Sequence, residues 1–450
     1  MVDAVETGLG AGAAPKMESD FSPRKLKIAG GMLIGQSFGT SILPYSAMAL
    51  MQIPLTKEFG WTSQQFGWGT FCLFFAGALS LWPLGRLVDK WGARPVLLVG
   101  SFIVGLVTLA MAFQTSSIVQ FYALYALLGV TGSTGITYTK ITAALFTQHR
   151  GKAMAILTAE TTLARAGIPL FVNWLLLTYG WQTMYVVFAC MIFACLPVLF
   201  FTIEEPGQRG ISFRRTPAAP PPPKVEFPGM TIWEALKDWV FWLTTLSAFF
   251  GLFIFNGQFP HIIPALVDKG FSQTTIVELQ SAAILVSFVG ALIGGWAADR
   301  FETAKIAVPF TLIASAGSVV LLVVSPSFGG VPLLGGSMMV GIIAFMALFP
   351  MGQYFATRFF GLNSLTEIIG VQFMCTNLVA GLGAPLFGAI YDSTKSYNWM
   401  FIIAAVLYFV IACIYLILPK YRFAKNIGEM PLMPEEPPFA IEQEVGLMQS

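Results

Sequence analysis

The sequence has little charge for its length. Of its 450 residues, 11% are charged and 56% are hydrophobic. Soluble globular chains carry about a quarter charged residues, so water could not surround this much apolar surface. Lipid is therefore the expected solvent for most of the chain. No clustered basic face of the kind that nucleic acid requires is found, and we expect no nucleic-acid partner.

Histidine and cysteine are also scarce. The two histidines, His149 and His261, are far apart and show no metal-ligand spacing. The five cysteines lie inside apolar runs, which argues against a disulfide framework. No phosphate-binding Gly-rich loop followed by Lys-Ser or Lys-Thr occurs. We therefore expect no metal, no cofactor, no use of ATP and no enzymatic activity.

Long apolar runs dominate what is present. A helix needs about 20 apolar residues to cross the roughly 30 Å hydrocarbon core, and the first 25 residues contain no apolar core that predicts a cleaved signal. The sequence predicts an all-α membrane protein with twelve spans, near 27–50, 66–86, 95–113, 118–143, 152–178, 182–202, 239–264, 275–297, 305–324, 331–356, 366–391 and 398–418.

These spans form two groups of six. The predicted bundles cover residues 27–202 and 239–418, and a polar, Pro-rich linker at 203–238 joins them. Tails at 1–26 and 419–450 flank them. The outer loops hold only Lys57, Lys269 and Lys395 of the 25 basic residues when both termini are inside. We therefore expect cytoplasmic termini, in a plasma membrane or a bacterial inner membrane.

Two sequence patterns recur at an offset of 210 residues. Gly60-Trp61-Thr62-Ser63 is matched by Gly270-Phe271-Ser272-Gln273, and Gly85-x-x-x-Asp89-Lys90 is matched by Gly295-x-x-x-Asp299-Arg300. Internal repeats are typical of secondary transporters, which bind their substrate at mid-membrane between the repeats. The two predicted bundles are therefore expected to be pseudo-repeats.

The segment from Gly85 to Arg94 resembles the loop motif of the major facilitator superfamily, between its second and third spans. The resemblance implies the major facilitator fold, with Gly85, Asp89, Lys90, Gly92 and Arg94 as the conformational loop motif and with Asp299 and Arg300 in the second copy. Glycines allow close helix approach, and the charges can form a cluster at a helix end.

Three stretches resemble the oxalate/formate antiporter and monocarboxylate porter branch of that superfamily. They are residues 129–138, residues 146–153, and Phe359-Phe360-Gly361 with the end of span eleven at 383–392. This resemblance implies a carboxylate substrate. The branch's anion-binding residues do not carry over, because span eight has only Glu278 near its outer end and span eleven has no Lys or Arg.

Lys140 and Glu160 are ionisable residues inside predicted spans four and five. Each lies about ten residues, or about 15 Å, from the turn between these spans, so they sit at matching depths. Two interpretations stay open. They form a buried ion pair without a transport role, or Glu160 accepts a proton whose binding Lys140 restrains.

Arg165 lies about 22 Å from the same turn, level with Ser133 and Thr134. No acid is level with it on span four, and Glu160 is five positions away, outside the spacing of helical neighbours. We expect its guanidinium to bind a substrate carboxylate. The alternatives are an acid or a carbonyl group elsewhere in the fold, or a water-filled cavity.

Further polar side chains inside the spans are substrate-binding candidates, with helix packing as the alternative. They are Thr134, Tyr138, Asn256, Gln258, Gln353, Tyr354, Gln372 and Asn377. His261 could titrate near neutral pH, but most histidines at the ends of membrane spans are simply interfacial residues. Pro44, Pro169 and Pro385 are expected to bend their helices.

The predicted function is secondary transport of a small mono- or dicarboxylate, coupled to protons, by a monomer in a lipid bilayer. The alternative is a major facilitator exporter of amphipathic or drug-like compounds. The 40 phenylalanines and the missing anion-binding residues of the branch favour this alternative.

Overall fold

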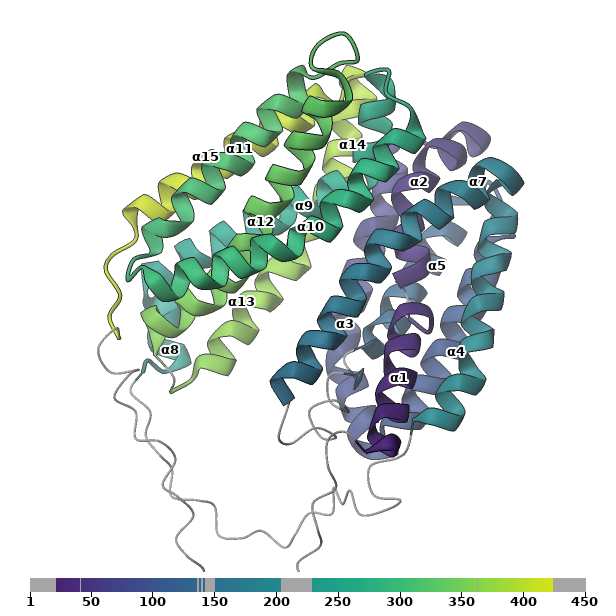
Figure 1. Ribbon diagram of the computed structural model, residues 1–450, viewed down its shortest axis with the longest axis horizontal. Coiled ribbons are helices and arrows are strands. Elements are labelled where there is room, and N and C mark those ends of the chain that lie inside the picture. Colours follow the sequence, from purple (N-terminus) through teal and green to yellow (C-terminus); the bar gives the residue numbers. More distant parts are fainter. Residues whose placement is uncertain are drawn as a thin grey trace, which may run out of the picture.

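The computed structural model describes residues 22–40, 42–135, 137–138, 141, 150–203, 229–361 and 363–423. These residues form two bundles of helices, and the described part of the chain contains isolated bridges but no strands (Figure 1). Seven of the described helices are long and apolar enough to cross a membrane. The predicted all-α membrane fold is confirmed.

The N-terminal bundle follows the six predicted spans. Its helices are α1 (Pro23–Phe38), α2 (Ile42–Phe59), α3 (Ser63–Trp91), α4 (Ala93–Met111), α5 (Ile118–Gly132), the 3-10 turn η1 (Ser133–Gly135) and α7 (Arg150–Thr202). Helices α1 and α2 together make the first span. Helix α7 contains the fifth and sixth spans, which meet at Gly180, where a φ of 83° reverses the chain.

The C-terminal bundle repeats this order after the short helix α8 (Ile232–Lys237), which lies in the segment predicted as linker. Its other elements are α9 (Trp239–Asp268), α10 (Gln273–Arg300), η2 (Ala304–Ile306), α11 (Ala307–Val323), α12 (Gly330–Phe360), α13 (Leu365–Ala380), α14 (Gly383–Thr394) and α15 (Asn398–Ile417). Helices α13 and α14 together make the eleventh span.

Two of the three prolines expected to bend a helix instead lie at the start of a new one. The first span breaks after Phe38 and the eleventh after Ala380, so Pro44 and Pro385 occupy the first turns of α2 and α14. The N–H groups of a first turn have no partner within the helix, so proline costs no hydrogen bond there. Pro169 lies inside α7, and the bend expected there stays a prediction.

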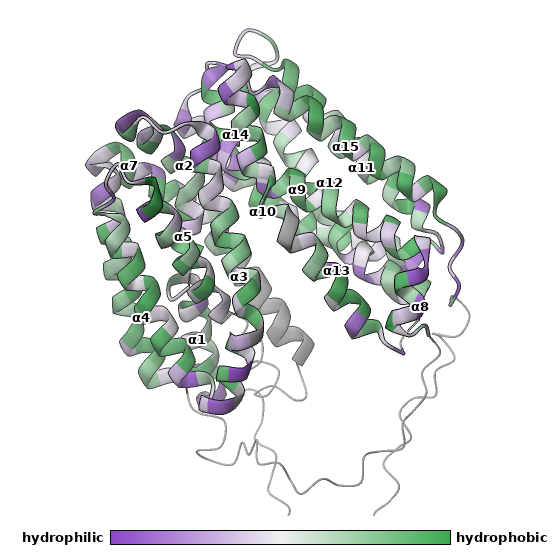
Figure 2. Cartoon of the chain, turned by 180° about the vertical axis from the view of Figure 1, so that it is seen from behind, coloured by the Kyte–Doolittle hydropathy of each residue, from purple (hydrophilic) through white to green (hydrophobic). Residues whose placement is uncertain are grey.

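Large apolar side chains cover much of the outside of the molecule. On α10, Phe288, Leu292 and Trp296 are 50%, 59% and 63% exposed. Hydrophobic residues run along the helices, and polar residues gather near the helix ends (Figure 2). Such a surface is stable only against lipid.

We call the end of the molecule at which α7 stops and α8 begins the linker end, and we call the opposite end the far end.

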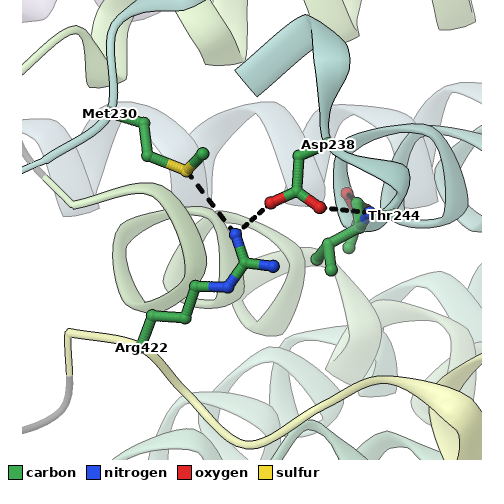
Figure 3. A network of polar contacts seen from close by, with 5 residues as sticks. Met230, Asp238, Thr244 and Arg422 are labelled. Carbon is green, nitrogen blue, oxygen red and sulfur yellow. Dashed lines mark hydrogen bonds and ion pairs between the residues drawn. The ribbon is translucent and has the colours of Figure 1, made fainter. Parts of the chain in front are cut away.

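At the linker end, Asp238 accepts a hydrogen bond from the backbone N–H of Val240 at 3.0 Å and so caps α9. Arg422 forms an ion pair with the same carboxylate (Figure 3). This pair attaches the segment after α15 to the start of α9.

The two bundles lie against each other at the far end and diverge toward the linker end (Figure 1). Hydrogen bonds cross between them at the far end. Gln52 donates to the hydroxyl of Tyr397 at 3.0 Å, and Gln273 donates to Asn173 at 2.8 Å. The conformation is therefore closed at the far end.

Candidate substrate-binding site

Arg165 lies on the inward face of α7. Leu163, Leu170 and Trp174 are 62%, 43% and 54% exposed and mark the outer face of this helix. At about 100° per residue, Arg165 points nearly opposite to them. Its side chain is nevertheless exposed, so it faces open space inside the molecule. In the described part of the chain, no carboxylate lies within ion-pair distance of its guanidinium.

A cluster of aromatic rings from both bundles lies near this position, with Tyr45 as the ring next to Arg165. The charge of Arg165 acts on the hydroxyl group of Tyr45 on α2. The Tyr45 ring stacks on Phe259 of α9, with centroids 4.8 Å apart and planes 8° apart, and meets the edge of Phe74 of α3 at 5.8 Å. A cation beside stacked rings can hold a carboxylate and pack the apolar part of the same molecule.

A pocket of about 130 Å³ lies between α9, α12, α13 and α15. It brings together two of the predicted binding residues, Gln353 and Gln372. Gln372 donates to the Thr244 hydroxyl at 3.0 Å, while Gln353 is exposed. Each glutamine lies about 10 Å along its helix from the linker end. This pocket is therefore closer to the linker end than Arg165 is.

Most of this pocket is apolar. Its remaining lining includes the rings of Phe345, Phe349, Phe355, Phe373 and Tyr415. The hydroxyl groups of Ser247 and Thr376 are already hydrogen-bonded to carbonyl oxygens of their own helices. The free hydrogen-bonding capacity of the pocket therefore comes mainly from its two glutamines.

Gln258 lines a second cavity, of about 160 Å³, between α9, α10, α11 and α12. Its Nε2 atom is buried and has no hydrogen-bond partner among the described residues. A buried amide without a partner costs free energy, so this group is available to water or to a ligand oxygen. Asn256, one half-turn earlier on α9, is 6% exposed.

Three other candidates are placed elsewhere. Thr134 is 2% exposed and donates to the carbonyl oxygen of Thr131 at 2.8 Å. Tyr138 is fully buried against Gly35 of α1. Near the linker end, the Tyr354 hydroxyl accepts a hydrogen bond from Nε of Arg358 at 2.8 Å. The structure does not bring these side chains to Arg165, and we leave them out of the proposed site.

Some predicted residues lie outside the described part of the chain. They are Lys140 and the side chains of Asp89, Glu160 and Asn377. The predicted proton site at Glu160 and Lys140 therefore stays a prediction.

The loop motif forms the tight turn between α3 and α4. Gly92 adopts a φ of 91°, and Arg94 donates to the carbonyl oxygen of Phe200 at 2.6 Å and stacks over its ring. We expected Gly85 to allow close helix approach. Among the described residues, no atom lies within 4 Å of the position of an added Cβ at Gly85, so this glycine is not at a close helix contact there.

Among the other motif residues, the side chains of Lys90, Asp299 and Arg300 are described, and all three are exposed. Lys90 lies in the last turn of α3, and Asp299 and Arg300 are the last two residues of α10.

Sequence reasoning missed Tyr45, Phe74 and Phe259. A phenylalanine that faces a cavity and one that faces lipid look alike in an apolar run, so periodicity could not select these rings. The hydroxyl group of Tyr45 in a predicted span was the one available signal, because a tyrosine in an apolar environment needs a polar partner.

Comparison with known proteins agrees with the fold described above. The family model of the Major Facilitator Superfamily matches residues 32–384 and 270–440. Monocarboxylate transporter 11 of Mus musculus is 23% identical, and the match covers 87% of this chain and 88% of that protein. The multidrug resistance protein MdtM of Escherichia coli (strain K12) is 33% identical over 31% of this chain and 34% of its own.

A solved structure has the same fold. It is the inward-facing and occupied conformation of a bacterial homologue of the human lysosomal transporter Spinster. The TM-score is 0.70 at 16% sequence identity, and the match covers 88% of this chain and 97% of that one.

Proposed function

Because the chain belongs to the Major Facilitator Superfamily, we propose that it is a secondary transporter that moves a small organic anion, a mono- or dicarboxylate, together with protons by alternating access. The observation that carries this proposal is Arg165. Its exposed guanidinium faces the inside of the molecule about 22 Å along α7, with no carboxylate partner in the described residues. A cation at mid-membrane is costly unless it is paired or performs a task.

The residues around Arg165 have distinct roles in this proposal. Arg165 binds the carboxylate by paired charge-assisted hydrogen bonds. Tyr45 and Phe259 pack the rest of the substrate. Gln353 and Gln372, nearer to the linker end, hold the substrate on its path into or out of the site. We assign proton binding to Glu160, with Lys140 restraining its protonation.

We assign the linker end to the cytoplasm, because the excess of Lys and Arg in the sequence lies there. The described conformation, closed at the far end, is then inward-facing. The similarity to relatives that are named monocarboxylate transporters supports a carboxylate over other classes of substrate.

A second function has its own support. The pocket that Gln353 and Gln372 line is mostly apolar and includes five aromatic rings, which suits an amphipathic compound, and MdtM is a relative over about a third of the chain. Under this alternative the protein exports such compounds and Arg165 serves packing or gating.

Uptake into proteoliposomes tests the proposal. An inward proton gradient should drive accumulation of labelled lactate, pyruvate, acetate or oxalate, and Arg165→Gln should abolish it. The matched control is Lys237→Gln, which removes an exposed cation at the linker end and should leave uptake unchanged. Gradient-driven uptake by Arg165→Gln would exclude the role of Arg165. Response to lipophilic cations, with no response to any acid, would favour the exporter.

A further inference from the structure

One close contact between the two bundles involves the backbones of both. Helices α3 and α14 cross there, and an added Cβ at Gly67 would lie 2.6 Å from the carbonyl group of Ala384. At Gly388 it would lie 2.4 Å from the carbonyl oxygen of Ser63. Asp392 accepts hydrogen bonds from the backbone N–H groups of Ser63, at 2.9 Å, and Gln64, at 2.8 Å. We call this set of residues the far-end contact.

His261 of α9 lies directly behind the far-end contact. Its side chain is 0% exposed, and its Nε2 lies 2.8 Å from the carbonyl oxygen of Ala384, the residue that touches Gly67. Because a carbonyl oxygen can only accept, Nε2 must carry the hydrogen. Nδ1 has no hydrogen-bond partner among the described residues. The site therefore fits a neutral imidazole.

Other titratable groups are close to this imidazole. Among the charged side chains that the structure describes, Asp392 of α14 is the one whose charge acts on the ring. The ring of Tyr397, in the turn before α15, lies 5.8 Å away and stacks on Tyr391 of α14 at 4.0 Å. Helix α2 contributes the uncharged Gln52 through its bond to Tyr397. On α9 itself, Asp268 lies two turns further on and interacts with Tyr391.

We propose that His261 is a proton-binding site whose protonation opens the far-end contact. A second proton would sit on Nδ1 and leave a buried N–H donor without an acceptor, at a cost of about 1–3 kcal/mol in the closed conformation. Separation of α3 from α14 would admit water to the ring. It would also free the Asp392 carboxylate from the start of α3, so that Asp392 could pair with the imidazolium. Protonation therefore favours the open conformation.

This inference rests on the proposed alternating access, and it assigns a direction to the effect of pH. The closed conformation favours the neutral imidazole of His261, and the open conformation favours the protonated imidazolium. The ratio of open to closed molecules should thus rise as pH falls below the ordinary histidine value of about 6.5. Because a single proton is bound, this ratio can change by at most about tenfold per pH unit.

Distance measurements between spin labels at the far end test this without any substrate. Labels at the exposed positions Thr178 of α7 and Ser327 before α12 report separation of the bundles, after the five native cysteines are replaced by alanine. Between pH 8 and pH 5 the wild type should gain a population with a longer distance. His261→Gln keeps a side-chain donor for the Ala384 carbonyl but cannot titrate, so it should keep one distribution throughout.

Full pH response in His261→Gln, or no response in the wild type, would overturn the inference. If His261→Gln does not fold, His149→Gln leaves His261 as the single histidine, and the NMR shift of its ring reports its protonation. Protonation should rise together with the long-distance population, and independent changes would overturn the inference. Failure to transport any carboxylate would refute the proposed function alone, because these measurements involve no transport.

Discussion

A methyl group at Gly388 should shift the protein out of the described conformation. The added Cβ would lie 2.4 Å from the Ser63 carbonyl oxygen, so α3 and α14 must separate by about 1 Å to reach ordinary van der Waals contact. Overpacking of this kind costs about 1–3 kcal/mol. The cost falls only on the closed far end, so the ratio of open to closed molecules should rise by about five- to 150-fold.

The spin-label pair at Thr178 and Ser327 measures this ratio directly. Gly388→Ala should show the longer distance at pH 8, where the wild type does not. The control is Gly336→Ala in α12, because an added Cβ at Gly336 meets no atom of the described residues within 4 Å. It introduces the same helix-stabilising change without touching α3. An unchanged distance in Gly388→Ala, or an equal change in both variants, would refute the reasoning.

Three further predictions concern polar contacts. Asp392→Asn removes the carboxylate that accepts two hydrogen bonds from the start of α3. The ratio of open to closed molecules should therefore rise by about tenfold in the same distance measurement. No change would show that the carboxylate is not needed for closure. Gln372→Ala removes an amide from the pocket that Gln353 and Gln372 line. The KM for uptake should rise by about five- to tenfold, while the far-end distances stay unchanged. An unchanged KM would place the substrate path elsewhere. Arg422→Ala breaks an ion pair in which Arg422 is 38% exposed. The free energy of unfolding, measured in a thermal melt, should fall by at most about 1 kcal/mol. A larger loss would mean that the segment after α15 holds the bundle together.

Much of the fold could be predicted from the sequence. Twenty-residue apolar runs leave few alternatives in lipid, because every backbone group must be bonded within a helix. The interruptions after Phe38 and Ala380 could not be placed in this way. Hydropathy does not fall at such a break. Pro44 and Pro385 lie just after the two breaks, but a proline inside an apolar run predicts a bend in a continuous helix equally well.

The candidate site was predicted in part. Arg165 was found because a charge in an apolar run is conspicuous, and its inward direction follows from the lipid-facing positions of the same helix. Gln353 and Gln372 share one pocket, a proximity that no sequence spacing encodes. Thr134 and Tyr138 look the same in the sequence but are packed between helices, because polarity alone does not tell which face of a helix meets a cavity.

The far-end contact could not be predicted from the sequence. Asp392 and Ser63 are 329 residues apart, and their pairing depends on the crossing of two helices from different bundles. The repeat at an offset of 210 residues predicted that the halves are related but contains no information on which residues meet between them.

The central claim is that Arg165 binds a carboxylate, and equilibrium binding tests it most directly. Purified protein should bind labelled lactate, pyruvate or oxalate saturably. Arg165→Gln should weaken binding by at least about tenfold, as expected for the loss of a charge-assisted hydrogen bond, while Arg165→Lys should restore part of it. Unchanged affinity in Arg165→Gln would contradict the account.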